Sequence, residues 1–173
     1  HILDRLHSYF YTVTVSYDGF DPNEKTEFYS MEDECEKIEQ EIKKKYDGRI
    51  KAAYGCSLGG SFVSLLIQRK RIHIEHGIIG SSDMDEAGNL VAKIQASMVV
   101  PFMYKMVHTG ALPKFMQKKL NKTDEAKKEL YNGFLNMFGI GKGGCPWITK
   151  QSIYNQFYSD LVTKVQHLSL IHI

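Results

Sequence analysis

Cysteine and proline are scarce in this sequence of 173 residues, which contains three of the former and four of the latter. Cys35, Cys56 and Cys145 are odd in number and widely scattered, so they form neither a disulfide framework nor the closely spaced ligand pairs of a zinc site. Such cysteine usage is typical of a reducing compartment, and we expect a cytoplasmic protein. No motif requires a cofactor or a metal ion, and none is expected.

An excess of one charge and a long hydrophobic run are also missing. The formal net charge is only +2, and no basic stripe is interleaved with aromatic residues, which argues against nucleic acid as a partner. No apolar run approaches the roughly 20 residues that cross a bilayer, and no signal peptide is visible, so no membrane span is expected. With 43% hydrophobic residues, the chain can bury the core of one domain with an insertion.

The sequence does contain a Gly-x-Ser-x-Gly motif, in which Ser57 stands between Gly55 and Gly59. An apolar, strand-like run (50–54) precedes the motif, and a helix-like run (61–70) follows it. A sharp turn from strand to helix would push the serine hydroxyl out of the fold and hold it over the positive end of a helix. Side chains at the two flanking glycines would collide across such a turn, and Gly60 would let the helix pack close to a neighbouring strand.

The stretch Tyr54-Gly55-Cys56-Ser57-Leu58-Gly59-Gly60 resembles the nucleophile elbow of the α/β-hydrolase family. The resemblance implies that Ser57 is the catalytic nucleophile and that the backbone N–H of Leu58 is one donor of the oxyanion hole. It also implies that the substrate is an ester or a similar acyl compound. The alternative interpretation is a glycine-rich turn that joins a strand to a helix and contains an incidental serine.

The segments around the motif alternate between strand and helix patterns. Val13 and Val15 alternate with threonines, as in a strand, and Ser30 with Asp33 resembles a capping box at the start of a helix. In order, we predict a strand at 10–17, a helix at 30–46, a strand at 50–56, a helix at 61–70 and a strand at 71–79. This order indicates an α/β fold with a parallel sheet, and the resemblance implies a truncated sheet of the α/β-hydrolase type. The loops 18–22, 56–60 and 80–85 are then expected to share one crevice.

Residues 84–150 differ in character, because methionine and phenylalanine residues follow helical spacing there. Ile94, Met98 and Phe102 share one helical face, and Pro101 predicts a kink in that helix. Inserted helices at this place resemble the lid of many α/β-hydrolases, which would surround a small apolar or acyl-containing substrate; the alternative is plain packing of helix on helix. We therefore divide the chain into a partial hydrolase core (1–83), a helical lid (84–150) and a returning helix with a tail (151–173), of which 166–173 need not belong to the domain.

The family mechanism also needs an acid and then a histidine after the serine in the chain. Asp83 is the candidate acid, with Asp85 as a second choice and a solvated acidic helix start as the alternative interpretation. No histidine stands where the family has its base, so no catalytic role is assigned to His73, His76, His108, His167 or His172. The resemblance thus implies the central portion of a longer hydrolase. This portion lacks an oxyanion strand and the strands with acid and base, and we expect it to be nearly inactive by itself.

Two functions of different class remain open. One is a serine hydrolase, and the other is a non-catalytic α/β module that binds a small molecule or a partner with the same crevice and lid. An enzyme that processes epoxides or halides would carry Asp at the centre of the elbow, where this chain has Ser57. Substrate identity and oligomeric state do not follow from the sequence. The geometric prediction is a strand that ends near Cys56, a helix that begins near Leu58 and a positive φ at Ser57.

Overall fold

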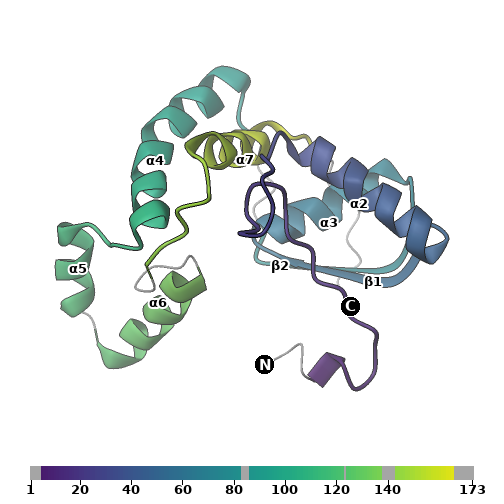
Figure 1. The fold of residues 1–173 in the computed structure, drawn as a ribbon, viewed down its shortest axis with the longest axis horizontal. Helices are drawn as coiled ribbons and strands as arrows, with labels where there is room; N and C mark the ends of the chain where they lie inside the picture. Colours follow the sequence, from purple (N-terminus) through teal and green to yellow (C-terminus); the bar gives the residue numbers. More distant parts are fainter. Residues whose placement is uncertain (1–4, 83–85, 123, 138–142, 166–173) are drawn as a thin grey trace.

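The computed structural model describes residues 5–82, 86–122, 124–137 and 143–165. Within these ranges the elements run in the order α2, β1, α3, β2, α4, α5, α6 and α7 (Figure 1). The α/β part comprises α2 (Met31–Tyr46), β1 (Arg49–Cys56), α3 (Leu58–Arg69) and β2 (His73–Gly80). Helices α4 to α6 form an arm that stands away from the strands, and α7 lies between this arm and the α/β part.

Strands β1 and β2 form a two-stranded parallel sheet, and α3 is the connection between them. The register pairs Arg49 with His73 at one end and Cys56 with Gly80 at the other. Parallel strands require a crossover of this kind, and α3 covers the sheet with a largely apolar, buried surface that includes Val63, next to Gly77 of β2. The carboxyl ends of the strands therefore lie side by side. The predicted mixed α/β class is confirmed in this β–α–β unit.

Helix α2 begins as its capping pattern predicts. The N–H of Asp33 donates a hydrogen bond of 3.1 Å to Ser30 Oγ, which satisfies one of the free donors of the first turn. Met31 and Cys35 have no exposed surface and pack with Phe62 of α3 in one core cluster. Burial raises the pKa of the Cys35 thiol to about 12. Cys35 is thus a core residue, as its place in the apolar stripe of the helix predicts.

A buried ion pair joins α2 to α3. Glu39 is 1% exposed, and its two carboxylate oxygens accept hydrogen bonds of 2.6 Å from Arg69 Nε and 3.0 Å from Arg69 Nη2. Arg71 Nη1 lies 3.6 Å from the same carboxylate. The hydrogen bonds to Glu39 raise the pKa of the Arg69 guanidinium. The buried carboxylate is compensated in this way, which is the condition for a charge to be tolerated inside a protein.

The predicted strand at 10–17 is wrong, because the structure assigns no strand to these residues. Val13 and Val15, which alternate as a strand requires, are 59% and 53% exposed. Alternation predicts an extended chain, but a strand also needs a hydrogen-bonded neighbour, and the described sheet consists of β1 and β2 alone. The segment is anchored at its end, where Tyr17 stacks on Phe62 with the ring centroids 4.3 Å apart.

Beyond β2 the chain forms α4 (Asn89–Thr109), α5 (Lys114–Asn121), α6 (Glu125–Met137) and α7 (Lys150–Val162). A second core cluster joins α4 to α7 and includes Val100 and Ile153. Pro101 lies inside α4, and the helix continues past it to Thr109. In the part of the chain that the structure describes, α4 is the one helix that is long and apolar enough to cross a membrane by length and composition. The role of this region as a lid, and the domain boundaries, stay predictions.

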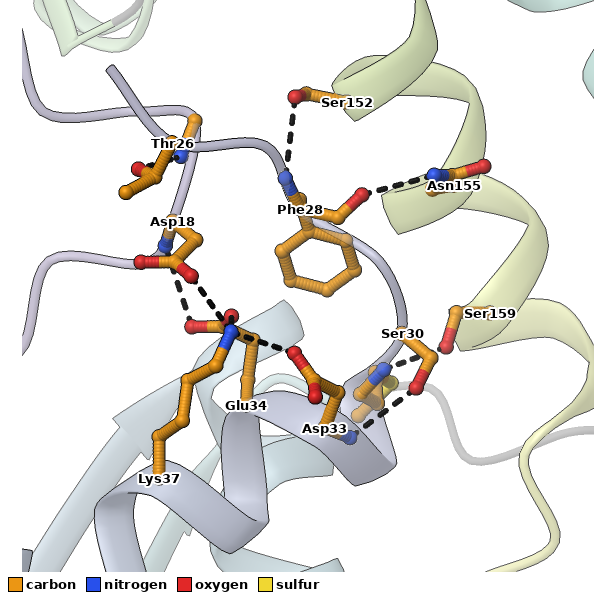
Figure 2. A network of polar contacts seen from close by, with 12 residues as sticks. Asp18, Thr26, Phe28, Ser30, Asp33, Glu34, Lys37, Ser152, Asn155 and Ser159 are labelled. Atoms are coloured by element: carbon orange, nitrogen blue, oxygen red, sulfur yellow. Dashed lines mark hydrogen bonds and ion pairs between the residues drawn. The ribbon is translucent and has the colours of Figure 1, made fainter. Parts of the chain in front are cut away.

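Helix α7 is hydrogen-bonded to the first residue of α2 and to the segment that precedes it (Figure 2). The N–H of Phe28 donates to Ser152 Oγ at 3.2 Å, and Asn155 Nδ2 donates to the carbonyl oxygen of Phe28 at 2.8 Å. The N–H of Met31 donates to Ser159 Oγ at 2.7 Å. These bonds satisfy backbone groups that have no strand partner, and they attach the returning helix to the α/β part.

Candidate active site

The chain turns sharply at Ser57, between the end of β1 at Cys56 and the start of α3 at Leu58. Ser57 has φ 54° and ψ −127°, a combination that residues with a side chain seldom adopt. The predicted ends of the strand and the helix are confirmed, and so is the predicted positive φ. A strained backbone of this kind persists only where its surroundings hold it in place.

The glycines of the motif have unequal roles in holding this corner. A Cβ atom at Gly55 would overlap the carbonyl oxygen of Gly59, because the first turn of α3 crosses directly over the end of β1. A Cβ atom at Gly60 would lie 2.6 Å from Ser82 Cβ and 3.0 Å from Ile79 Cγ2, so Gly60 lets the helix approach β2, as predicted. The prediction for Gly59 is wrong: a Cβ atom there would meet nothing within 4 Å, since only its backbone faces Gly55.

The side chain of Ser57 is exposed and makes no capping hydrogen bond to α3. Its backbone N–H donates to the carbonyl oxygen of Gly80 at 2.9 Å, which ties the corner to the end of β2. Leu58 is the first residue of α3, so its N–H has no acceptor within the helix. This N–H and the positive end of the helix dipole lie beside Ser57, where they can stabilise negative charge.

A second strained serine lies next to the corner. Ser81 directly follows β2, has φ 47° and is exposed. Ser82 Oγ lies 3.0 Å from Ser61 Oγ of α3, so side chains as well as backbone join the loop after β2 to the corner at Ser57. No motif selects these serines. In the sequence, the one indication of their role is that two polar residues follow β2, the strand that pairs with β1.

The loop 18–22, which was expected at the same crevice, is held by the first turns of α2. The N–H of Asp18 donates to Glu34 Oε2 at 3.2 Å, and Lys37 Nζ lies 2.6 Å from Asp18 Oδ2 (Figure 2). Burial raises the pKa of Glu34, although its hydrogen bond from Lys37 acts in the opposite direction. Asp18 is a structural residue of this loop, and in the described ranges no hydrogen bond joins the loop to Ser57.

The acid and the base of a triad are not assembled in the described residues. Several titratable residues of interest lie outside them: Asp83, Asp85, His167 and His172. His73 and His76 lie on β2, and His108 lies on α4, where it packs against Tyr104. None of these three histidines is hydrogen-bonded to Ser57. Within the described residues, the structure therefore places an exposed serine side chain beside the free N–H at the start of a helix, and no histidine is hydrogen-bonded to that serine.

An open hollow of about 750 Å³ lies at the opposite end of the strands, with Lys43, Lys70 and His73 in its lining. His73 pairs with Arg49 at the start of both strands, whereas Ser57 follows their carboxyl ends, so this hollow is separate from the corner. Among the residues that the structure describes, no group of three or more His, Cys, Asp or Glu side chains could hold a metal ion.

Iodoacetamide is expected to modify Cys56 in the folded protein and to leave Cys35 intact. Cys56 is exposed beside Ser57, whereas Cys35 is buried with a thiol pKa of about 12. Because the thiolate is the reactive form, raising the pH to about 9 speeds the reaction of an exposed thiol but yields almost no thiolate at Cys35. Mass spectrometry of tryptic peptides measures both reactions, and in urea both cysteines should react. Equal rates in the folded protein would contradict the core position of Cys35.

The chain resembles a known protein in structure but not in sequence. Its sequence matches no protein-family model and no curated protein. The chain is similar to the crystal structure of an alpha/beta hydrolase family protein from Desulfitobacterium hafniense, with 15% sequence identity and a TM-score of 0.62. The likeness covers 87% of this chain and 56% of that chain, so this chain spans little more than half the length of its neighbour. At 15% identity this likeness shows the fold alone, and the fold of the chain is α/β-hydrolase-like.

Proposed function

We propose that this chain carries the nucleophile of a serine α/β-hydrolase that acts on an ester or a similar acyl compound. The observation that supports it most is the exposed Ser57 side chain at a positive φ, between the carboxyl end of β1 and the amino end of α3. If the side chain at this corner had no function, we would expect glycine there, because glycine adopts a positive φ without strain. The α/β-hydrolase-like fold supports the same assignment.

In the proposed reaction, Ser57 Oγ attacks the carbonyl carbon of the substrate while its proton passes to a general base. The carbonyl oxygen becomes an oxyanion, which the Leu58 N–H and the positive end of α3 stabilise. The tetrahedral intermediate then expels the alcohol, which takes up the proton, and an acyl-enzyme remains on Ser57. Water hydrolyses this ester and restores the serine. The base and the second oxyanion donor come from outside the described residues, and Asp83 is the candidate acid.

The proposed substrate is small and apolar or acyl-containing, and helices α4 to α6 are proposed as the lid that selects it. The methionine and phenylalanine content of this region supports the choice, because flexible and aromatic side chains adapt to acyl chains. No cofactor takes part in the proposed reaction, and the cytoplasm is the proposed location.

A fluorophosphonate probe tests the nucleophile. The chain should be labelled on Ser57, whereas Ser57→Ala should not be labelled. Labelling should be slow, because no histidine of the described residues is bonded to Ser57, and added imidazole should accelerate it by supplying a base. Ser81→Ala is the matched control, since Ser81 is a neighbouring exposed serine that also has a positive φ. Equal labelling of the wild type and Ser57→Ala would overturn the assignment.

The second candidate function is a non-catalytic module that binds a small molecule or a partner at the same crevice. The observation that favours it is the missing base beside Ser57 within the described residues. This function predicts a folded chain that resists the probe even in imidazole, while Ser57→Ala unfolds at the same temperature as the wild type. Labelling that depends on Ser57 excludes this candidate in favour of the hydrolase.

A further inference from the structure

The outward face of α4 carries an exposed apolar stripe. Leu90, Ile94, Met98 and Phe102 recur every four residues and are 72%, 53%, 75% and 37% exposed, and Val91 beside them is 51% exposed. Isolated apolar side chains are common on protein surfaces, but a continuous stripe along three turns of one helix marks an interaction surface.

The opposite face of the same helix is packed inside the protein. Ala92, Ala96 and Val100 are buried, and the last two belong to the core cluster that contains Ile153 of α7. Only 22% of the most apolar stretch of α4 is buried. The buried face nevertheless packs α4 against α7 along its side. Crossing a membrane would require α4 to give up this cluster. The stripe is therefore a surface that can lie on a partner.

The charges in the same part of the chain all have one sign. Between residues 89 and 122 the sequence has no Asp or Glu and has six lysines, namely Lys93, Lys105, Lys114, Lys118, Lys119 and Lys122. The rest of the chain has 16 Lys and Arg residues against 20 Asp and Glu residues, so the small net charge conceals a basic segment (89–122) in an otherwise acidic chain. Lys105 is exposed and stands two helical turns after Met98, on the same face as the stripe, and Lys118 of α5 is also exposed.

We propose that the stripe and these lysines dock the protein on an anionic lipid surface. The apolar side chains of α4 enter the boundary between headgroups and acyl chains, and the lysines contact the acidic headgroups. Two other occupants match the surface less completely. A second copy would place one segment that has lysines but no Asp or Glu against another such segment, and like charges repel. A nucleic acid or an acidic protein would use the lysines and leave the apolar stripe in water.

Sedimentation of the full chain with lipid vesicles tests the proposal. The chain should bind vesicles of phosphatidylcholine mixed with phosphatidylserine, bind phosphatidylcholine alone weakly, and be released by salt. The double variant Ile94→Gln/Met98→Gln should bind at least about tenfold more weakly, because two exposed apolar side chains no longer enter the membrane. The double variant Lys105→Gln/Lys118→Gln should lose about fivefold per lysine. All four positions are outside the core, so circular dichroism should show unchanged folding.

Matched controls separate the surface from charge in general and from catalysis. Lys43→Gln/Lys44→Gln, at the exposed end of α2, should bind like the wild type, and so should Ser57→Ala, because docking does not depend on the proposed chemistry. In Met98→Trp, the emission maximum of the new tryptophan should shift to shorter wavelength when anionic vesicles are added. The emission of Trp147, measured in the wild type, should not change. Three results would each overturn the proposal: equal binding to neutral vesicles, full binding by Ile94→Gln/Met98→Gln, or a dimer in solution that this variant abolishes.

Discussion

Replacing Gly55 by alanine is expected to lower the free energy of unfolding by about 3 kcal/mol. The new Cβ atom would overlap the carbonyl oxygen of Gly59, and this obstacle is backbone, which cannot rotate away as a flexible side chain can. The first turn of α3 must therefore move off the end of β1, which also displaces Ser57. Urea unfolding followed by circular dichroism measures the stability, and fluorophosphonate labelling reports the corner itself.

Gly59→Ala is the matched control, with the same chemical change four residues along the motif. A Cβ atom there meets nothing within 4 Å, and the residue lies in the first turn of α3 with no positive φ. Alanine favours a helix over glycine, so the stability should be unchanged or higher by up to about 1 kcal/mol. Similar losses in the two variants would show that Gly55 does not face the backbone of Gly59.

Arg69→Ala is expected to lower the free energy of unfolding by about 3–5 kcal/mol. The substitution removes both short hydrogen bonds to Glu39 and leaves that carboxylate buried between α2 and α3. Arg71 lies 3.6 Å from Glu39 Oε2 and is half exposed, so it compensates only a part of the charge. The same urea unfolding experiment measures the loss.

The control for this prediction is an exposed ion pair in the same helix. Lys45 Nζ lies 2.6 Å from Glu41 Oε1, and both side chains are at least half exposed. Water and salt screen such a pair, so Lys45→Ala should lower the free energy of unfolding far less than Arg69→Ala does. A loss for Arg69→Ala as small as that for Lys45→Ala would mean that Glu39 reaches solvent, which contradicts its burial.

Features that depend on neighbouring residues in the chain could be predicted from the sequence. The cap at Ser30, the end of β1 at Cys56 and the start of α3 at Leu58 all arise from hydrogen bonds and backbone angles within a few residues. The positive φ of Ser57 belongs to the same class, because Gly55, two residues before it, leaves room for the first turn of α3. For this reason the candidate nucleophile could be selected from the sequence before its surroundings were known.

Features that depend on distant segments could not be predicted. The alternation at 10–17 describes two faces of an extended chain but not the hydrogen-bonding neighbour that would make it a strand. Gly55 and Gly59 have unequal roles because the helix crosses over the strand at Gly55. The motif has a glycine on each side of the serine and does not indicate which of them is crossed. The bond between Ser61 and Ser82, from two elements that meet only in the fold, is a third example.

The sequence by itself determined the sharp corner at Ser57, because backbone sterics and hydrogen bonding act over a few residues there. Tertiary structure alone decided which side of each element is covered. Helix α4 shows this most clearly, since both of its faces are apolar in sequence, yet Ala96 packs on α7 and Met98 remains in solvent. The hydrophobic effect favours burial of every apolar side chain, and only the shape of the folded chain settles which of them find a partner.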